Sequence, residues 1–219
     1  MGYSIAIDGP AGAGKSTIAK RVAKEKGYIY VDTGAMYRGL ALHFLNKSIA
    51  PDDETSIAKA CACVKVKLAY ENGNQQIYVN ETNVTSRLRE EAVGNMASMS
   101  AAIPQVRAAL LELQRELART EDIVMDGRDI GTFVLPDANV KVFLTASVET
   151  RAKRRYDELV ETGVQTVALA EIESDITKRD ERDINRSVAP LKQAEDAVRI
   201  DSSHMSIEEV VDAILKLCK

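Results

Sequence analysis

The sequence predicts an α/β fold in which helices cover both faces of a parallel sheet of five strands, with a small antiparallel element inserted. Three observations support this fold class. Short apolar runs alternate with segments of helical periodicity over most of the 219 residues, which is the pattern of a parallel sheet. A glycine-rich segment connects the first apolar run to the first helical segment. The alternation breaks at about residues 62–88, where the pattern has a period of two.

The first part of the chain predicts two strands and three helices. Residues 3–7 are short, apolar and partly β-branched, and residues 28–31 repeat that character, so both runs indicate buried strands. Helical spacing of apolar residues covers 17–26 and returns at 35–46. A surface turn at 50–53 then precedes a short helix at 57–61.

The break in the pattern predicts a hairpin. Residues 64–70 alternate with period two, 71–74 contain a turn signal, and 76–79 continue as a strand. We therefore expect an inserted subdomain over about residues 62–88.

The second half of the chain returns to strands and helices in alternation. Strands are predicted at 123–125, 140–144 and 197–200, and helices at 87–100, 105–119, 148–162 and 167–184. Pro104 suits the first turn of the long helix that follows it. Ser206 and Glu209 match a capping box, which marks the start of the last helix.

The glycine-rich segment fits the pattern G-x-x-x-x-G-K-[ST] of a phosphate-binding P-loop. It consists of Gly9, Pro10, Ala11, Gly12, Ala13, Gly14, Lys15, Ser16 and Thr17. Strand, glycine turn and helix follow in the order that the motif requires. Lys15 can reach the β- and γ-phosphates of a nucleotide, and the Ser16 hydroxyl is placed to bind Mg²⁺. We expect these nine residues to bind ATP.

Further polar residues follow other strand ends, where ligands bind in sheets of this kind. Asp126 ends an apolar strand, the position of a magnesium-binding Asp in P-loop enzymes. Arg128 and Asp129 come directly after it, and Arg38 follows the end of the second strand. An arginine can bind a phosphate at two points, and a carboxylate can accept a hydrogen bond from an amine.

Arginines also cluster at 151–155 and 179–186. A solvated helix face accounts for some charged residues of the second cluster, namely Asp180 and Glu181. The number of arginines exceeds what such a face needs. Phosphoryl transfer gives them a use, because arginines neutralise charge on the migrating group.

With these residues, the chain resembles the bacterial cytidylate kinases, a family of nucleoside-monophosphate kinases. The resemblance runs from end to end and is most specific in D-T-G-A-M-Y-R at 32–38 and D-G-R-D-I-G-T at 126–132. It implies transfer of the ATP γ-phosphoryl group to CMP or dCMP with Mg²⁺. It also implies a core (about 1–61, 89–150 and 187–219), an NMP-binding insertion (about 62–88) and a helical lid (about 151–166).

The resemblance also implies roles for individual residues. Ser98, Arg107 and Asp129 match residues that read cytosine, and Thr33 stands where some members of the family have Ser. The acceptor phosphate would be held by Arg38, Arg128 and Arg186, and the ribose would lie near Arg179 and Asp183. Together with Lys15, the expected catalytic residues are Arg128, Arg151, Arg155 and Arg186, with Arg151 and Arg155 on the lid. The expected metal ligands are Ser16 and Asp126.

Composition and net charge limit the classes of partner that we expect this protein to bind. The net charge of −4 argues against a general nucleic-acid binder, and no apolar run approaches the length of a membrane span. The first strand begins almost at once, and the three cysteines lack metal-ligand spacing, so we expect a cytoplasmic monomer that binds only nucleotides.

Two other functions stay open on the sequence. One is a P-loop kinase for another small acceptor, such as shikimate or a different nucleotide. The other is a nucleotide-dependent switch without turnover, although Asn46-Lys47-Ser48-Ile49 lacks the Asp of the guanine-reading motif N-K-x-D.

Overall fold

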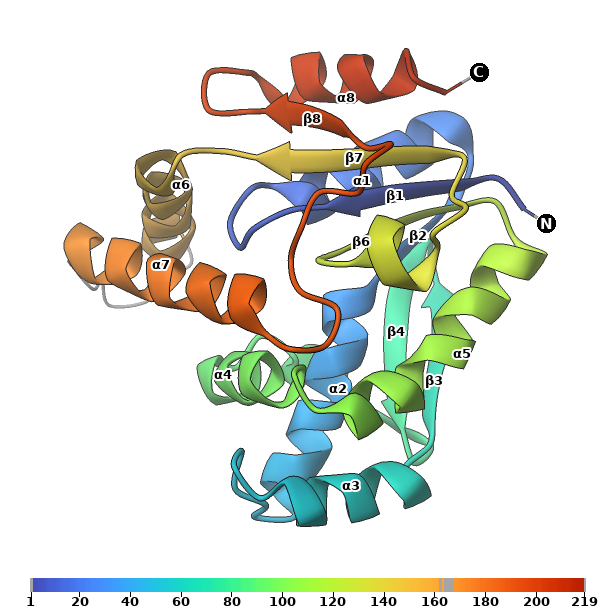
Figure 1. Ribbon diagram of the computed structural model, residues 1–219, viewed down its shortest axis with the longest axis vertical. Helices are drawn as coiled ribbons and strands as arrows, with labels where there is room; N and C mark the ends of the chain where they lie inside the picture. The colour runs from blue at the N-terminus through green and yellow to red at the C-terminus, as the bar shows by residue number, and fades with distance from the viewer. Residues whose placement is uncertain (1, 162, 164–167, 219) are drawn as a thin grey trace.

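A parallel sheet of five strands forms the centre of the molecule, with strand order β2-β6-β1-β7-β8 (Figure 1). The structure is a computed structural model that describes residues 2–161, 163 and 168–218. The strands are β1 (Ser4–Asp8), β2 (Ile29–Asp32), β6 (Ile123–Gly127), β7 (Val140–Thr145) and β8 (Val198–Asp201). The five predicted strands are thus all present, and the predicted fold class is confirmed.

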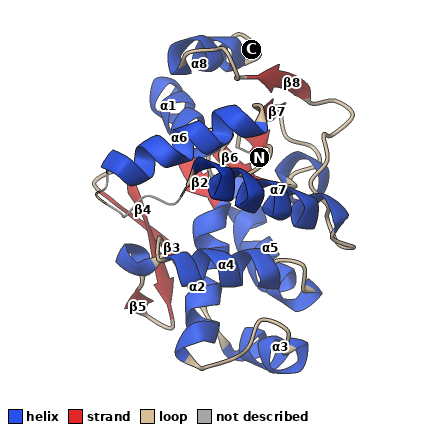
Figure 2. Cartoon of the chain, turned by 90° about the vertical axis from the view of Figure 1, so that its left-hand side faces the viewer, coloured by secondary structure: helices blue, strands red, loops and turns tan. Residues whose placement is uncertain are grey.

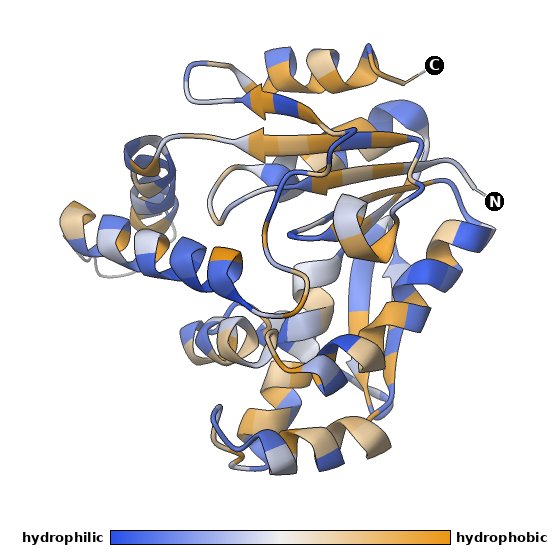
Figure 3. Ribbon diagram, in the orientation of Figure 1, coloured by the Kyte–Doolittle hydropathy of each residue, from blue (hydrophilic) through white to orange (hydrophobic). Residues whose placement is uncertain are grey.

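Helices cover both faces of this sheet and make three layers. Side chains alternate between the faces of a strand, so Ile5 and Ile7 pack with α1 (Lys15–Lys26) and α8 (Ile207–Leu215), whereas Ala6 lies on the opposite side. That side is covered by α2 (Thr33–Asn46) and α5 (Pro104–Thr120). Hydrophobic residues dominate the central strands (Figure 3).

Local signals set most helix boundaries. Ser206 and Glu209 form both bonds of the predicted capping box, and Pro104 occupies the first turn of α5. The Asp32 side chain caps α2, so that helix begins two residues before its predicted start. The predicted helix at 87–100 begins only at Glu91, because a 3-10 turn occupies Thr85–Arg87.

The predicted hairpin is present and belongs to a second, antiparallel sheet. Its strands are β3 (Val66–Glu71), β4 (Asn74–Val79) and the short β5 (Thr82–Asn83), which the sequence did not reveal. Asn72 and Gly73 both have positive φ, as a tight two-residue hairpin turn requires. Ile77 and Val79 pack into the same hydrophobic cluster as α2, α3 (Glu54–Cys63) and α4 (Glu91–Ser100), below the large sheet in Figure 1.

Helices α6 (Val148–Glu161) and α7 (Leu169–Asn185) lie beside the carboxyl ends of the central strands, as Figures 1 and 2 show from two sides. They pack together through a small cluster that contains Ala152, Ile172 and Ile176. The predicted helices at 148–162 and 167–184 and the predicted lid at 151–166 include residues 162 and 164–167, which lie outside the described residues.

Candidate active site

The glycine-rich loop joins β1 to α1, as the motif predicts. Gly9 has a φ of 152°, and a Cβ atom there would lie 1.9 Å from the carbonyl oxygen of Leu144, so only glycine fits. Gly14 has a φ of 86° and precedes the first residue of α1. The loop therefore leads into a helix N-terminus, where backbone N–H groups favour the binding of a phosphate.

Lys15 lies under this loop, with its Nζ donating to the carbonyl oxygen of Pro10 at 2.7 Å. Burial holds the pKa of Lys15 well below its usual value, and the Arg128 guanidinium lowers it further, while the Asp126 carboxylate opposes both effects. A polyphosphate bound in the loop would bring negative charge close to Lys15 and so favour its charged form.

Asp126 forms the centre of a hydrogen-bond network at the end of β6. Its two carboxylate oxygens accept from the Ser16 hydroxyl at 3.0 Å and from the Tyr30 hydroxyl at 2.8 Å. Burial raises the pKa of Asp126 to about 6, and the nearby Asp32 carboxylate adds to the shift. The structure thus brings together the two predicted metal ligands.

The chemistry of this pair fits Mg²⁺. A hydroxyl and a carboxylate are hard oxygen donors, and Mg²⁺ is usually held by one or two carboxylates together with water and substrate phosphates. Among the described residues, no group of three or more His, Cys, Asp or Glu side chains is arranged to hold a metal ion. Ser16 and Asp126 would hold Mg²⁺ together with water and the phosphate chain.

A second set of charged residues begins where β2 meets α2. Arg38 donates to the Asp32 carboxylate at 3.1 Å, and its side chain is 28% exposed, so a ligand can reach it. Thr33 is buried and donates to the carbonyl oxygen of Asp126 at 2.7 Å. The Thr33 hydroxyl therefore ties the start of α2 to β6.

Arg128 and Arg179 meet on the α7 side of the site. Arg128 donates to the Asp183 carboxylate at 2.8 Å. Burial lowers the pKa of Arg179 to about 10, with the charges of Arg128 and Arg38 acting in the same direction. The predicted phosphate residues Arg38 and Arg128 are thus accompanied by Arg179, which the resemblance assigns to the ribose.

Asp129 is held between two buried arginines. Arg107 of α5 donates to one of its oxygens, and Arg186 donates to the other at 3.0 Å. The predicted cytosine-reading pair Arg107 and Asp129 is therefore in direct contact. Arg186, which the resemblance assigns to the acceptor phosphate, also contacts this carboxylate.

Several polar atoms near these residues lack a hydrogen-bond partner within the described part of the chain. They include Nε and Nη1 of Arg107 and the buried Oγ of Ser98. Buried polar groups in native proteins are nearly always paired. Unused donors on two residues that were predicted to read a base therefore indicate a place for a polar ligand.

Arg151 is buried beneath the P-loop. Its guanidinium donates to the carbonyl oxygen of Ala11 at 2.9 Å and to the Asp180 carboxylate at 2.6 Å, and Asp180 also accepts from the backbone N–H of Ala11. The prediction that Asp180 belongs to a solvated face is therefore wrong, because α7 packs this carboxylate against the loop. Arg155 is exposed and pairs with Glu158 on its own helix.

Asp8 carries a role that the sequence did not suggest. Its carboxylate accepts from the backbone N–H of Ile130 at 2.8 Å and of Gly131 at 2.7 Å. These two residues open the π-helical turn Ile130–Val134, directly after Asp129. Asp8 therefore couples the end of β1 to the loop that carries Asp129. Only the tertiary fold brings these segments together, so no local signal could have revealed the contact.

Burial raises the pKa of Asp8 from 3.8 to about 6, with Asp129 adding to the shift, while the two N–H donors and Lys15 act against it. The folded protein therefore binds a proton on the Asp8 carboxylate more tightly than the unfolded chain does. The contribution of Asp8 to the free energy of unfolding falls as pH rises from about 4 to about 6, by roughly 3 kcal/mol.

Urea unfolding of the wild type and Asp8→Asn at pH values of about 5 and 7 should show the wild type losing stability relative to the variant at the higher pH. A difference that does not change with pH would contradict this.

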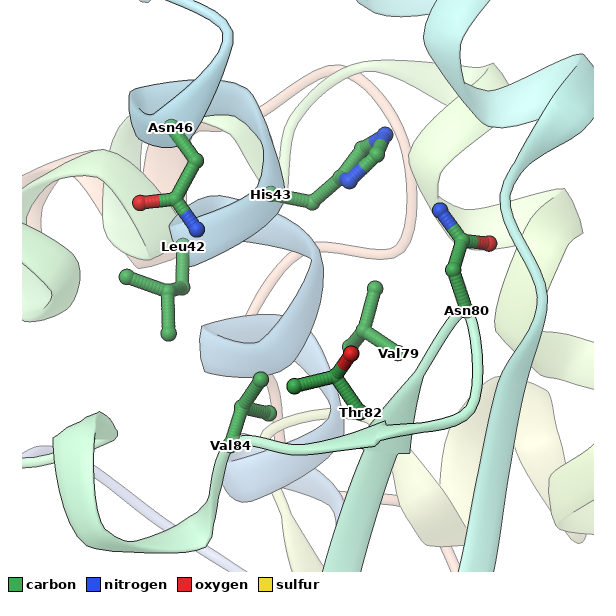
Figure 4. Close-up of a pocket in the computed structure, with 7 residues that line it drawn as sticks. All are labelled: Leu42, His43, Asn46, Val79, Asn80, Thr82 and Val84. Carbon is green, nitrogen blue, oxygen red and sulfur yellow. The ribbon is translucent and has the colours of Figure 1, made fainter.

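Two cavities lie away from these residues. One of about 610 Å³ is lined by four exposed residues of α7, namely Lys178, Glu181, Arg182 and Asn185. The other, of about 210 Å³, lies between the end of α2 and the turn from β4 to β5 (Figure 4). None of the predicted site residues lines either cavity, so the candidate site is defined by the charged network at the strand ends.

Known proteins resemble the chain over nearly its whole length. The family model described as cytidylate kinase matches residues 5–219. A cytidylate kinase of Halalkalibacterium halodurans is 47% identical over 99% of this chain and 97% of that protein. One of Lactiplantibacillus plantarum is 49% identical over 97% of this chain and 93% of that protein.

Solved structures support the fold at lower identity. A gluconokinase from Sinorhizobium meliloti gives a TM-score of 0.51 at 16% identity and covers 98% of this chain and 91% of that one. A shikimate kinase from Bacteroides thetaiotaomicron gives 0.50 at 16% identity, with 98% and 97% covered. The strand-end site, the family match and the relatives agree, and the chain belongs to the cytidylate kinase family.

Proposed function

We propose that this protein transfers the γ-phosphoryl group of ATP to CMP or dCMP and so forms CDP or dCDP and ADP. The observation that carries the proposal is the buried carboxylate of Asp129, held by Arg107 and Arg186 next to unused donors of Arg107. Cytosine offers an amine that donates and a carbonyl and ring nitrogen that accept. The pair Asp129 and Arg107 has the complementary groups.

The P-loop supplies the donor half of the site. Residues 9–17 bind the ATP phosphates, with Lys15 at the β- and γ-phosphates. Mg²⁺, when bound by Ser16, Asp126 and the phosphate oxygens, neutralises charge on the phosphate chain. Arg151 stabilises the P-loop, because its guanidinium donates a hydrogen bond to the carbonyl oxygen of Ala11.

The acceptor half faces it from α2, β6 and α7. Arg38 and Arg128 bind the acceptor phosphate, together with Arg179, and Asp183 orients Arg128. Ser98 completes the base site. An oxygen of the acceptor phosphate attacks the γ-phosphorus while the bond to the leaving ADP oxygen breaks. The attacking oxygen is already anionic at neutral pH, so the reaction needs no protein base, and catalysis consists of positioning and charge stabilisation.

The proposal also covers the location of the protein, its oligomeric state and the roles of its subdomains. No helix in the described part of the chain is long and apolar enough to cross a membrane. We place the enzyme in the cytoplasm as a monomer whose ligands are nucleotides. The hairpin region at 62–88 serves the NMP-binding side, and α6 forms part of a lid over ATP.

A coupled assay of ADP release tests the proposal with CMP, dCMP, UMP, AMP and shikimate as acceptors, each with and without Mg²⁺. We expect the cytidine nucleotides to give the highest kcat/KM and chelation of Mg²⁺ to abolish turnover. Equal use of UMP or AMP would contradict the acceptor assignment. Binding of ATP without turnover on any acceptor would favour a nucleotide-dependent switch.

A further inference from the structure

The side chain of Gln75 makes two hydrogen bonds to the backbone of one residue of the central sheet. Its Oε1 accepts from the N–H of Asp32 at 2.9 Å, and its Nε2 donates to the carbonyl oxygen of Asp32 at 3.1 Å. Gln75 lies on β4 of the inserted hairpin, whereas Asp32 ends β2 of the central sheet. The amide thus pairs with the main chain of β2 in the way that a neighbouring strand would.

The place of β2 in the sheet explains why this contact matters. β2 is an outer strand, with β6 on one side, and its other edge has no strand partner among the described residues. Tyr70, opposite Gln75 in the hairpin, donates its hydroxyl to the carbonyl oxygen of Tyr30 on the same edge at 3.1 Å. The cross-strand pair Tyr70 and Gln75 therefore covers the open edge of β2.

Asp32 transmits this contact to the active site. One oxygen of its carboxylate caps α2 by accepting from the N–H of Ala35 at 2.8 Å, and the other holds Arg38 at 3.1 Å. Gln75 fixes the main chain of Asp32, and the side chain of Asp32 fixes Arg38. A shift of Asp32 would therefore move the guanidinium that faces the acceptor phosphate.

We propose that Gln75 is a positioning residue for the acceptor phosphate, acting through Asp32 and Arg38, and that the hairpin thereby sets the affinity for the phosphorylated acceptor. The inference rests on the proposed function, because it takes Arg38 as a ligand of that phosphate. It assigns to the inserted hairpin a part in binding without direct contact with the nucleotide.

The matched variants are Gln75→Ala and Gln76→Ala. Gln76 is the next residue of β4, and its side chain accepts from Asn83 within the small sheet. A third variant, Gln75→Glu, keeps the size of the side chain and an acceptor for the Asp32 N–H, but loses the donor to the Asp32 carbonyl oxygen. Calorimetric titration with CMP and with cytidine separates effects on the phosphate from effects on the base, and steady-state kinetics give the KM for ATP.

We expect Gln75→Ala and Gln75→Glu to weaken CMP binding by about three- to tenfold. Cytidine affinity and the KM for ATP should stay near the wild-type values, and Gln76→Ala should behave as the wild type. CMP affinity unchanged in both Gln75 variants would overturn the inference. So would an equal loss for CMP, cytidine and ATP, which would indicate a general structural role. A wild-type protein that does not phosphorylate CMP would instead overturn the proposed function, and this inference with it.

Discussion

Replacing Lys15 by methionine should lower kcat/KM for CMP phosphorylation by on the order of 10³, while the protein stays folded. Methionine keeps the length and the apolar stem of the side chain but removes the charge. In the folded protein the Lys15 ammonium is buried and donates to Pro10, and burial lowers its pKa. The charge is thus held at a cost to stability, which is expected of a group whose partner is a substrate phosphate.

Two measurements distinguish this role from packing. Lys24→Met on the exposed side of the same helix should keep full activity. Thermal unfolding of Lys15→Met should begin close to the wild-type temperature, because the lost hydrogen bond to Pro10 is offset by relief of a buried charge. A variant that loses activity and thermal stability to the same extent would show that Lys15 serves the fold.

Much of the site could be predicted because its parts are local in sequence. Strand, glycine turn and helix are neighbours around Lys15, and polar residues such as Asp32 and Asp126 lie at the ends of central strands. The parallel sheet with helices on both faces follows from the alternation of strands and helices, whereas the order of its strands was not predicted. Each of these inferences uses a pattern a few residues long, and the structure confirms the pattern in every case named here.

The contacts that tune the site could not be predicted in the same way. Asp180 lies within a run of charges and has the sequence context of a solvated residue, yet α7 places it against Ala11 and Arg151. Gln75 has no charge and no motif, and its partner Asp32 is 43 residues away in sequence. Such contacts depend on how helices and hairpins pack, and neither composition nor periodicity predicts that packing.

Asp32 is an intermediate case. An Asp before a helical segment is a recognised start signal, and it could have moved the predicted start of α2 from residue 35 to its observed place. The same side chain also binds Arg38 one turn later. Local chemistry could thus have indicated one of its two roles in advance.

Asp129→Asn should remove most of the preference for CMP over UMP, lowering the ratio of their kcat/KM values by about 10²- to 10⁴-fold. A carboxylate has about four lone-pair sites, and Arg107 and Arg186 use two of them. The remaining sites can accept from the amine of cytosine and would repel the carbonyl oxygen that uracil has at that position. An asparagine can turn its amide toward that oxygen, so UMP should gain as CMP loses.

The two arginines add a second effect to this prediction. Removal of the charge leaves Arg107 and Arg186 buried without their common carboxylate, and breaking one partner of a buried ion pair costs about 3–5 kcal/mol. Asp129→Asn should therefore also unfold at a lower temperature, whereas Asp137→Asn at the exposed turn before β7 should change neither property. Selectivity has to be measured below the unfolding transition, with the KM for ATP as the internal reference. If stability falls but the ratio of CMP to UMP stays at the wild-type value, Asp129 holds two arginines together and does not read the base.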